Sequence, residues 1–221
     1  MLVARRRERL EAVAAELGAD AEVCDVGDRT QVEDLADRVG SRDPAVHLLV
    51  NNAGIPGCGS FLELDAERIE AVVRTNYLGS VWCLRAFVPL LEAAAPAHVV
   101  NVVSVAGLVA HGASGPYSAA KHAQLAFSRA VNAELGQRGI RVHTVCPGPV
   151  ETPGFPQRAL QRGLAHRVVL RPEQVAERIL GAVEHDRAEV VVPRYLRLAG
   201  VAQALLPSAV SRLATRARGR A

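Results

Sequence analysis

The sequence predicts an α/β fold in which a doubly wound parallel sheet carries helices on both faces. Short apolar runs alternate along the chain with segments whose apolar residues have helical spacing. The runs are apolar throughout rather than at every second residue, as is typical of strands buried on both faces. We find no internal repeat, linker or low-complexity tract, so we expect a single domain over residues 1–221.

The first elements have clear boundary signals. After an apolar run at residues 2–4, helical spacing up to Leu17, followed by Gly18, predicts a helix with a glycine C-cap. Residues 21–26 are strand-like, and Asp28 with Gln31 resembles a capping box at the start of a second helix. The remaining expected elements are a strand at 47–50, a long helix from Asp65 to about Leu91, a strand at 98–103, a helix from Pro116 to Leu135, a strand at 140–145, a helix at 172–183, a strand at 189–192 and a helical, basic tail from Leu196.

Composition narrows the class of protein. Hydrophobic residues make up 49% and charged residues 22% of the chain, which is ordinary for a globular protein. The 23 acidic residues nearly balance the 26 basic ones and no nucleic-acid reader motif is present, which argues against nucleic-acid binding. Four cysteines lie without metal-ligand spacing, so we expect reduced thiols, no metal and a cytoplasmic protein. Neither a signal peptide nor an apolar run of membrane-spanning length is recognisable.

Lys121 is the only lysine in the chain, so 26 − 1 = 25 basic residues are arginines. It lies four residues after Tyr117, which places a phenol and an ammonium on one face of the expected helix. Lysine presents a compact charge on a flexible stem, whereas arginine is a planar fork. The pair indicates chemistry that needs a small cation near a phenol, although a surface pair at this spacing also arises by chance.

Polar and small residues follow three of the expected strands. Parallel strands bind ligands beyond their carboxyl ends, so these residues should line one crevice, to which the helix with Tyr117 and Lys121 adds. They are Asn51-Asn52-Ala53-Gly54 after the strand at 47–50, Ser104 to Gly107 after 98–103, and Pro147-Gly148-Pro149 after 140–145.

Together, Asn51-Asn52-Ala53-Gly54, Ser104, Tyr117-x-x-x-Lys121 and Pro147-Gly148 resemble the short-chain dehydrogenase/reductase family in its compact branch. Ser104 precedes Tyr117 by 117 − 104 = 13 residues, which fits the family spacing. The resemblance covers nearly the whole chain. It implies a Rossmann-like fold and an oxidoreductase that transfers a hydride between a nicotinamide cofactor and an alcohol or ketone.

The resemblance also implies the catalytic roles. Tyr117 would be the general acid–base, and Lys121 would lower its pKa and bind the nicotinamide ribose. Ser104 would donate a hydrogen bond to the substrate oxygen. Asn76 lies in an otherwise apolar helical segment and would hold a local helix distortion and a water of the proton relay. The alternative for Asn76 is a core side chain satisfied by the backbone.

Further residues match the family's cofactor contacts. At the end of the family's second strand this chain has Ala4, then Arg5 and Arg6, where NAD-specific members have an acid. Arginine binds phosphate bidentately, so we expect NADP(H) to be preferred, with NAD(H) possible. The alternative is a solvated basic helix start. The other expected contacts are Asp25 and Val26 with adenine, Asn51, Ala53 and Gly54 along the cofactor, Pro147 and Gly148 in the third turn, and Val150 and Thr152 at the carboxamide.

The family's first strand and its glycine-rich TGxxxGxG turn, which cradles the pyrophosphate, have no counterpart in this sequence. Three explanations remain open: a start placed too late in a longer protein, a truncated inactive remnant, or a partner subunit that folds with a gap. We favour the first because the catalytic set is intact. The missing strand would be central, so we expect two unpaired strand edges and weak or no NADPH binding by residues 1–221 alone.

Substrate and partners are less sharply indicated. Residues 151–171 should form the substrate loop, and their apolar side chains, Phe155, Leu160, Leu164, Val168, Val169 and Leu170, favour an apolar alcohol or ketone. The family usually pairs its subunits through the helices that carry Asn76 and Tyr117, which predicts a homodimer or homotetramer. The basic tail could cover the substrate site, contact a second subunit or rest on a membrane surface, and ordinary docking is favoured.

Overall fold

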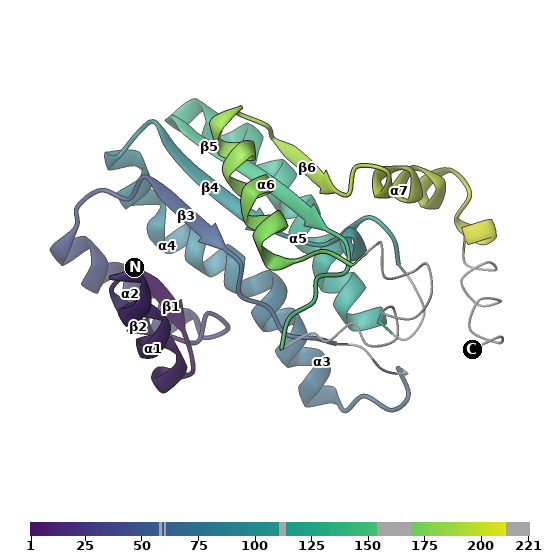
Figure 1. Cartoon of the computed structure of the whole chain (residues 1–221), viewed down its shortest axis with the longest axis horizontal. Coiled ribbons are helices and arrows are strands. Elements are labelled where there is room, and N and C mark those ends of the chain that lie inside the picture. Colours follow the sequence, from purple (N-terminus) through teal and green to yellow (C-terminus); the bar gives the residue numbers. More distant parts are fainter. Residues whose placement is uncertain (58, 60, 111–113, 154–168, 211–221) are drawn as a thin grey trace.

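The computed structural model describes residues 1–57, 59, 61–110, 114–153 and 169–210 (Figure 1). Strands and helices alternate along the chain, as the sequence predicts. In chain order the elements are β1 (Leu2–Ala4), α1 (Arg7–Leu17), β2 (Ala21–Val23), α2 (Arg29–Arg42), β3 (Leu48–Asn51), α3 (Ala66–Val73), the π-helical turn η1 (Arg74–Leu78), α4 (Gly79–Ala93), β4 (Ala97–Val102), the short η2 (Val105–Gly107), α5 (Gly115–Leu135), η3 (Gly136–Arg138), β5 (Ile140–Pro147), α6 (Pro172–Glu184), β6 (Glu189–Val192) and α7 (Leu196–Leu205).

The described strands form two parallel sheets. β1 pairs with β2, and β3, β4, β5 and β6 form a second sheet in that order. Helices cover both faces of the larger sheet: α4 and α5 pack on one face, and α6 packs on the other (Figure 1). The predicted α/β architecture with parallel strands and helices on both faces is therefore confirmed.

Apolar side chains on alternate positions of β4 belong to different cores. Val99 packs in the large core that α2, α4 and β5 share, whereas Val100 packs with Val145 and with Val175 of α6. The two cores lie on opposite faces of the sheet, because successive side chains of a strand point to opposite faces. The continuous apolar runs of the sequence thus have the physical cause expected of them: both faces of the central strands are buried.

A gap separates the two sheets between β1 and β3. Within the described residues, β1 pairs only with β2 and β3 pairs only with β4, so each strand has one open edge. Leu48 and Val50 of β3 are 43% and 41% exposed, whereas Leu49 between them packs against the large core. Val50 is in register with Val100, which lies on the α6 face, so the exposed apolar surface belongs to that face. Each of these two edges leaves backbone groups available to a further strand.

Helix boundaries follow their sequence signals with two informative differences. Gly18 ends α1 in the left-handed region at φ 61°, and the Asp28 carboxylate accepts hydrogen bonds from the backbone N–H groups of Thr30 and Gln31. The Gln31 side chain completes no reciprocal capping box, because its oxygen accepts from the backbone N–H of Asp25 instead. The expected long helix from Asp65 is interrupted by η1, a π-helical turn. None of the helices within the described residues has the length and apolar character needed to cross a bilayer.

Gly79 lies at the start of α4, where this helix packs closely against Val26. A Cβ there would lie 2.9 Å from Cγ2 and 3.2 Å from the backbone oxygen of Val26. We expect Gly79→Ala to lower the free energy of unfolding by about 1–3 kcal/mol, because the contact overpacks the site. Gly181→Ala in α6 is the matched control. Its Cβ would meet nothing within 4 Å, so it should gain about 0.5–1 kcal/mol of helix propensity. Urea unfolding of both variants measures the difference, and equal stabilities would contradict the close approach.

Candidate active site

The carboxyl ends of β3, β4 and β5 meet at one edge of the larger sheet. The three strands are parallel and in register, with Asn51 opposite Asn101 and Val102 opposite Val145. Ser104 follows the end of β4, and β5 ends at Pro147. The structure therefore brings the three predicted turns to the same edge, as Figure 1 shows from the common direction of the arrows.

Helix α5 carries Tyr117 and Lys121 and packs against both η1 and η2. A Cβ on Gly107 in η2 would lie 2.7 Å from the backbone oxygen of Lys121, so glycine is needed for the turn to touch the helix. Gly57 makes a similar approach, with its Cβ position 3.3 Å from Cβ of Tyr117. The turns after β3 and β4 thus both lie against the helix face that bears the phenol and the ammonium.

Lys121 is buried, with 4% of its surface exposed. Its Nζ donates to the backbone oxygen of Val102 at 3.0 Å and to Oε1 of Gln124 at 2.8 Å. Burial lowers the pKa of Lys121 to about 7, while the neighbouring Cys146 raises it slightly. A lysine with this pKa changes charge near neutral pH, which suits a residue that tunes a phenol.

Ser104 caps η2 at the end of β4. Its Oγ accepts a hydrogen bond from the backbone N–H of Ala106 at 3.1 Å. That bond fixes the hydroxyl oxygen at the strand end, and the hydroxyl hydrogen remains a donor. Ser104 can therefore donate to the oxygen of a molecule bound beside the turn.

Asn76 lies in the π-helical turn η1 and is fully buried. Its side chain accepts from the N–H of Ile55 at 2.7 Å and donates to the backbone oxygen of the same residue at 2.9 Å. The local helix distortion expected at Asn76 is present, and the side chain is satisfied by backbone groups. Its Oδ1 is also 3.2 Å from the position of a Cβ on Gly54, so Asn76 holds the Asn51–Gly54 turn close to η1.

A buried column of polar side chains runs beneath the strand ends, and sequence reasoning identified only its first member. Asn51 Nδ2 donates to Asn101 Oδ1, and Asn101 Nδ2 donates to Ser128 Oγ, both at 2.9 Å. Ser128 Oγ and Thr144 Oγ1 are 2.6 Å apart. The column joins β3, β4, α5 and β5. Asn101 within an otherwise apolar strand run was the sequence signal that could have revealed it.

The expected adenine and phosphate contacts lie on the smaller sheet, across the gap. Arg5 Nη1 is 3.3 Å from Asp25 Oδ2, and Asp25 Oδ1 accepts from the backbone N–H of Gly27. Arg6 is the exposed N-cap residue of α1, and Val26 contacts the Gly79 backbone of α4. Both arginines are exposed.

The turn after β5 is held by β6 and α7. The Gly148 N–H donates to the Val192 oxygen at 2.6 Å, and a Cβ on Gly148 would meet Leu196 of α7 at 2.8 Å. Val150 forms a β-bridge with Leu170, and Thr152 is half-buried beside it. Leu170, expected in the substrate loop, is instead a core residue under α6. The expected substrate-loop residues Phe155, Leu160, Leu164 and Val168 lie outside the described residues.

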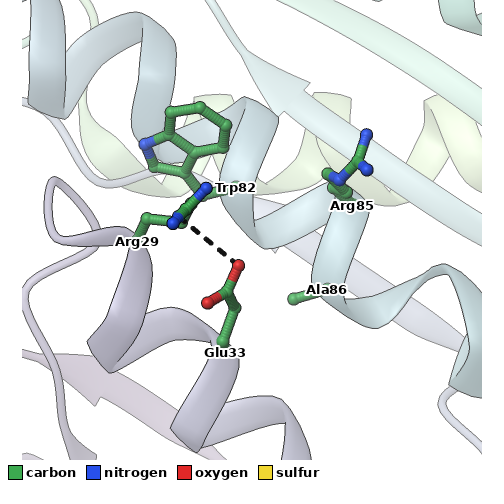
Figure 2. A pocket seen from close by; sticks show the side chains of 5 residues that line it. All are labelled: Arg29, Glu33, Trp82, Arg85 and Ala86. Carbon is green, nitrogen blue, oxygen red and sulfur yellow. Dashed lines mark ion pairs between the residues drawn. The ribbon is translucent and has the colours of Figure 1, made fainter.

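A hollow of about 170 Å³ lies elsewhere on the molecule, between α2 and α4. Figure 2 shows the side chains that line it. Arg29 and Glu33 of α2 form an ion pair at 3.5 Å, and Trp82, Arg85 and Ala86 of α4 complete the lining. No predicted site residue lines this hollow. The turns at the strand ends and the face of α5 that carries Tyr117 and Lys121 therefore stay the candidate site on the chemistry of their side chains.

The model of the short chain dehydrogenase family matches residues 1–163. The chain belongs to this family. The 1-deoxy-11-beta-hydroxypentalenate dehydrogenase of Streptomyces exfoliatus is 36% identical over 186 residues, which cover 83% of this chain and 67% of that protein. The chain spans about two thirds of the length of that dehydrogenase and of its namesakes in two other Streptomyces species.

Two solved structures share the fold over most of the chain. An actinorhodin polyketide ketoreductase with NADPH is 31% identical with a TM-score of 0.77, covering 86% of this chain and 84% of that one. A short chain dehydrogenase from Burkholderia cenocepacia with NADP is 27% identical with a TM-score of 0.78, covering 94% and 82%.

These likenesses confirm the family and the Rossmann-like fold expected from the sequence. The chain is an NAD(P)-dependent oxidoreductase of the short chain dehydrogenase family, in which hydride passes between a nicotinamide cofactor and an alcohol or ketone. The roles of individual residues, and the choice between NADP(H) and NAD(H), remain predictions.

The clamp made by Asn76 gives a prediction about stability. Asn76→Ala should lower the free energy of unfolding by about 2–4 kcal/mol, because the N–H and C=O of Ile55 lose their partners inside the protein. Asn52→Ala, at an exposed position of the Asn51–Gly54 turn, should change the free energy of unfolding by less than about 0.5 kcal/mol. Urea denaturation of the two variants measures both values. A loss below about 1 kcal/mol at Asn76 would argue against the clamp.

Proposed function

We propose that Ser104, Tyr117 and Lys121 catalyse the reduction of a ketone, or the reverse oxidation of an alcohol, with NADP(H) as cofactor. The observation that carries this proposal is the buried ammonium of Lys121 on the helix face of Tyr117, packed against the turn that begins at Ser104. Alternatives without catalysis, such as an inert remnant or a partner subunit, leave this arrangement without a purpose.

The chain's own residues handle the substrate oxygen and its proton. When bound, the cofactor supplies or accepts the hydride. Tyr117 gives its phenol proton to the carbonyl oxygen during reduction and takes it back during oxidation. Ser104 donates a hydrogen bond to the same oxygen and stabilises the negative charge that develops there. Charged Lys121 stabilises the phenolate form of Tyr117 by its positive charge.

Asn51, Ala53 and Gly54 with Pro147, Gly148, Val150 and Thr152 form the proposed cofactor wall on the larger sheet. The smaller sheet would contribute Asp25 and Val26 at the adenine and Arg5 and Arg6 at the ribose phosphate. The exposed guanidinium groups of Arg5 and Arg6 support a 2′-phosphate and hence NADP(H), because arginine binds phosphate bidentately. NADPH and NADP in two structural relatives agree with this choice.

We further propose that a strand followed by a helix, from outside residues 1–221, occupies the gap between β1 and β3. The open edges of both strands and the exposed side chains of Leu48 and Val50 support an added parallel strand. A helix after that strand would cover the apolar face of β3 and bring its N-terminus to the pyrophosphate. This supports a longer form of the chain over an inactive remnant or a partner subunit.

The substrate, subunit arrangement and location are proposed on thinner grounds. A ketoreductase and a pentalenate dehydrogenase among the relatives support an apolar alcohol or ketone as substrate. A homodimer or homotetramer through the helices of Asn76 and Tyr117 follows the family habit. α7 docks through Leu196, while Leu198 and Leu205 are exposed and available to a subunit or, less favoured, a membrane surface. Unpaired Cys24, Cys83 and Cys146 support a reducing, cytoplasmic location.

Tyr117→Phe tests the catalytic proposal. The chain is extended at its N-terminus with the strand, glycine-rich turn and helix of the actinorhodin ketoreductase, and NADPH oxidation is followed with a panel of ketones. Removing the phenol proton should reduce kcat by at least about 100-fold. The matched control is Tyr195→Phe at an exposed tyrosine, which should keep full activity. Equal rates in the Tyr117→Phe variant and the unmodified extended chain would exclude Tyr117 as the acid–base.

Arg5→Asp tests the cofactor choice in the same extended chain. Loss of a charge-assisted pair to the 2′-phosphate should weaken NADPH binding about 10- to 100-fold and leave NADH binding nearly unchanged. Arg9→Asp makes the same charge change at an exposed position of α1, which begins after Arg5, and should have a small effect on both cofactors. Calorimetric titration gives the four dissociation constants. Unchanged NADPH affinity in Arg5→Asp would remove the assignment.

A further inference from the structure

Gln124 lies one helical turn after Lys121 on α5, and its amide is buried with 1% exposure. Residues three apart on a helix share a face, so the two side chains meet. The Oε1 atom of Gln124 lies closer to the Lys121 ammonium than the Val102 oxygen does, at 2.8 Å against 3.0 Å. The polar amide at this buried position therefore has a specific partner.

An ammonium has three N–H donors. Val102 at the end of β4 and Gln124 on α5 accept two of them from the interior side. One N–H is then left for a further acceptor. Because the ammonium is tetrahedral, the two acceptors together fix the direction of its third N–H.

Among the described residues, we find no charged side chain that acts on the ammonium. Cys146 on β5 is the ionisable neighbour that acts on it, and burial raises the pKa of that thiol to about 12, so it is uncharged at neutral pH. On α5 itself, Tyr117 precedes Lys121 by one turn, and the ring of His122 turns back to the Ser118 oxygen at 2.8 Å. Residues 102–107, which lead from β4 through η2, contribute no charged side chain. The amide of Gln124 thus supports the cation by hydrogen bonding alone.

We propose that Gln124 is a positioning residue. Its Oε1 and the Val102 oxygen hold two N–H groups of the Lys121 ammonium, so that a single N–H is left for an acceptor at the strand ends. The proposal rests on the proposed function only for what that last N–H meets, a ribose hydroxyl of the cofactor. The coupling between Gln124 and Lys121 itself needs no cofactor. A neutral acceptor rather than a carboxylate keeps the charge of Lys121 adjustable, because a carboxylate would lock it as an ion pair.

The single lysine of this chain makes the coupling directly measurable. Lysine labelled isotopically at Cε and Nζ gives one side-chain signal, whose pH titration by NMR reports the pKa of Lys121 without further assignment. We expect a midpoint near 7 in the unmodified 221-residue protein. The isosteric Gln124→Glu should strengthen proton binding by Lys121 about tenfold or more, and Gln124→Met, which lacks an acceptor oxygen, should weaken it about tenfold.

Gln137→Glu, at an exposed position of η3, is the matched control. It adds the same charge far from Lys121 and should leave the titration unchanged. Circular dichroism identifies variants that fold, and Gln124→Glu carries the test if Gln124→Met does not fold, because it preserves shape. A folded Gln124→Glu protein with the unmodified midpoint would overturn the proposal.

Kinetics in the extended chain separate this proposal from the proposed function. If charged Lys121 is needed, the rate of reduction falls as pH rises through its pKa, so Gln124→Glu should move this fall to higher pH. A shifted NMR titration together with full activity of Tyr117→Phe would leave the coupling intact and disprove the catalytic proposal. An unshifted titration together with an inactive Tyr117→Phe would disprove the coupling between Gln124 and Lys121 and leave the catalytic proposal intact.

Discussion

The buried column from Asn51 through Asn101 and Ser128 to Thr144 is the constraint on which the crevice depends. It ties the neighbouring strands β3 and β4 to α5 and β5 by hydrogen bonds within the interior. Because each member would be costly to leave unpaired there, the column fixes the register of the strand ends and the position of α5 together. The column therefore helps to fix the position of Ser104, at the end of β4, relative to Lys121 on α5.

The two sheets carry two different sets of proposed contacts. The four-stranded sheet holds the proposed catalytic groups, and its central strands are covered by helices on both faces. The small sheet of β1 and β2 holds the proposed adenine and phosphate contacts, and α2 joins it to α4 across the large core. The gap between β1 and β3 lies between the two sets of proposed contacts. Proposed catalysis and proposed cofactor binding can therefore be separated by experiment.

Much of the fold is predictable from the sequence because the signals are local. Continuous apolar runs indicate the parallel sheet, Gly18 and Asp28 mark helix ends, and the lone lysine after Tyr117 marks the helix of the candidate site. Features that depend on tertiary contacts are not predictable in this way. The family resemblance implies a helix distortion at Asn76, and η1 is found there. The partners of Asn101 and the amide of Gln124 under Lys121 become visible only when distant segments pack. The apolar character of Leu170 favours a place in the substrate loop, but its bridge to Val150 makes it a core residue.

The proposed catalytic groups lie on the larger sheet and α5, whereas the cofactor phosphates are proposed to bind at the gap between the two sheets. Calorimetric titration of NADPH into the 221-residue protein, beside the chain extended by a strand, glycine-rich turn and helix, tests this division most directly. We predict no saturation below about 1 mM for the first and a dissociation constant of about 1–10 μM for the second. Micromolar binding by residues 1–221 alone would contradict it.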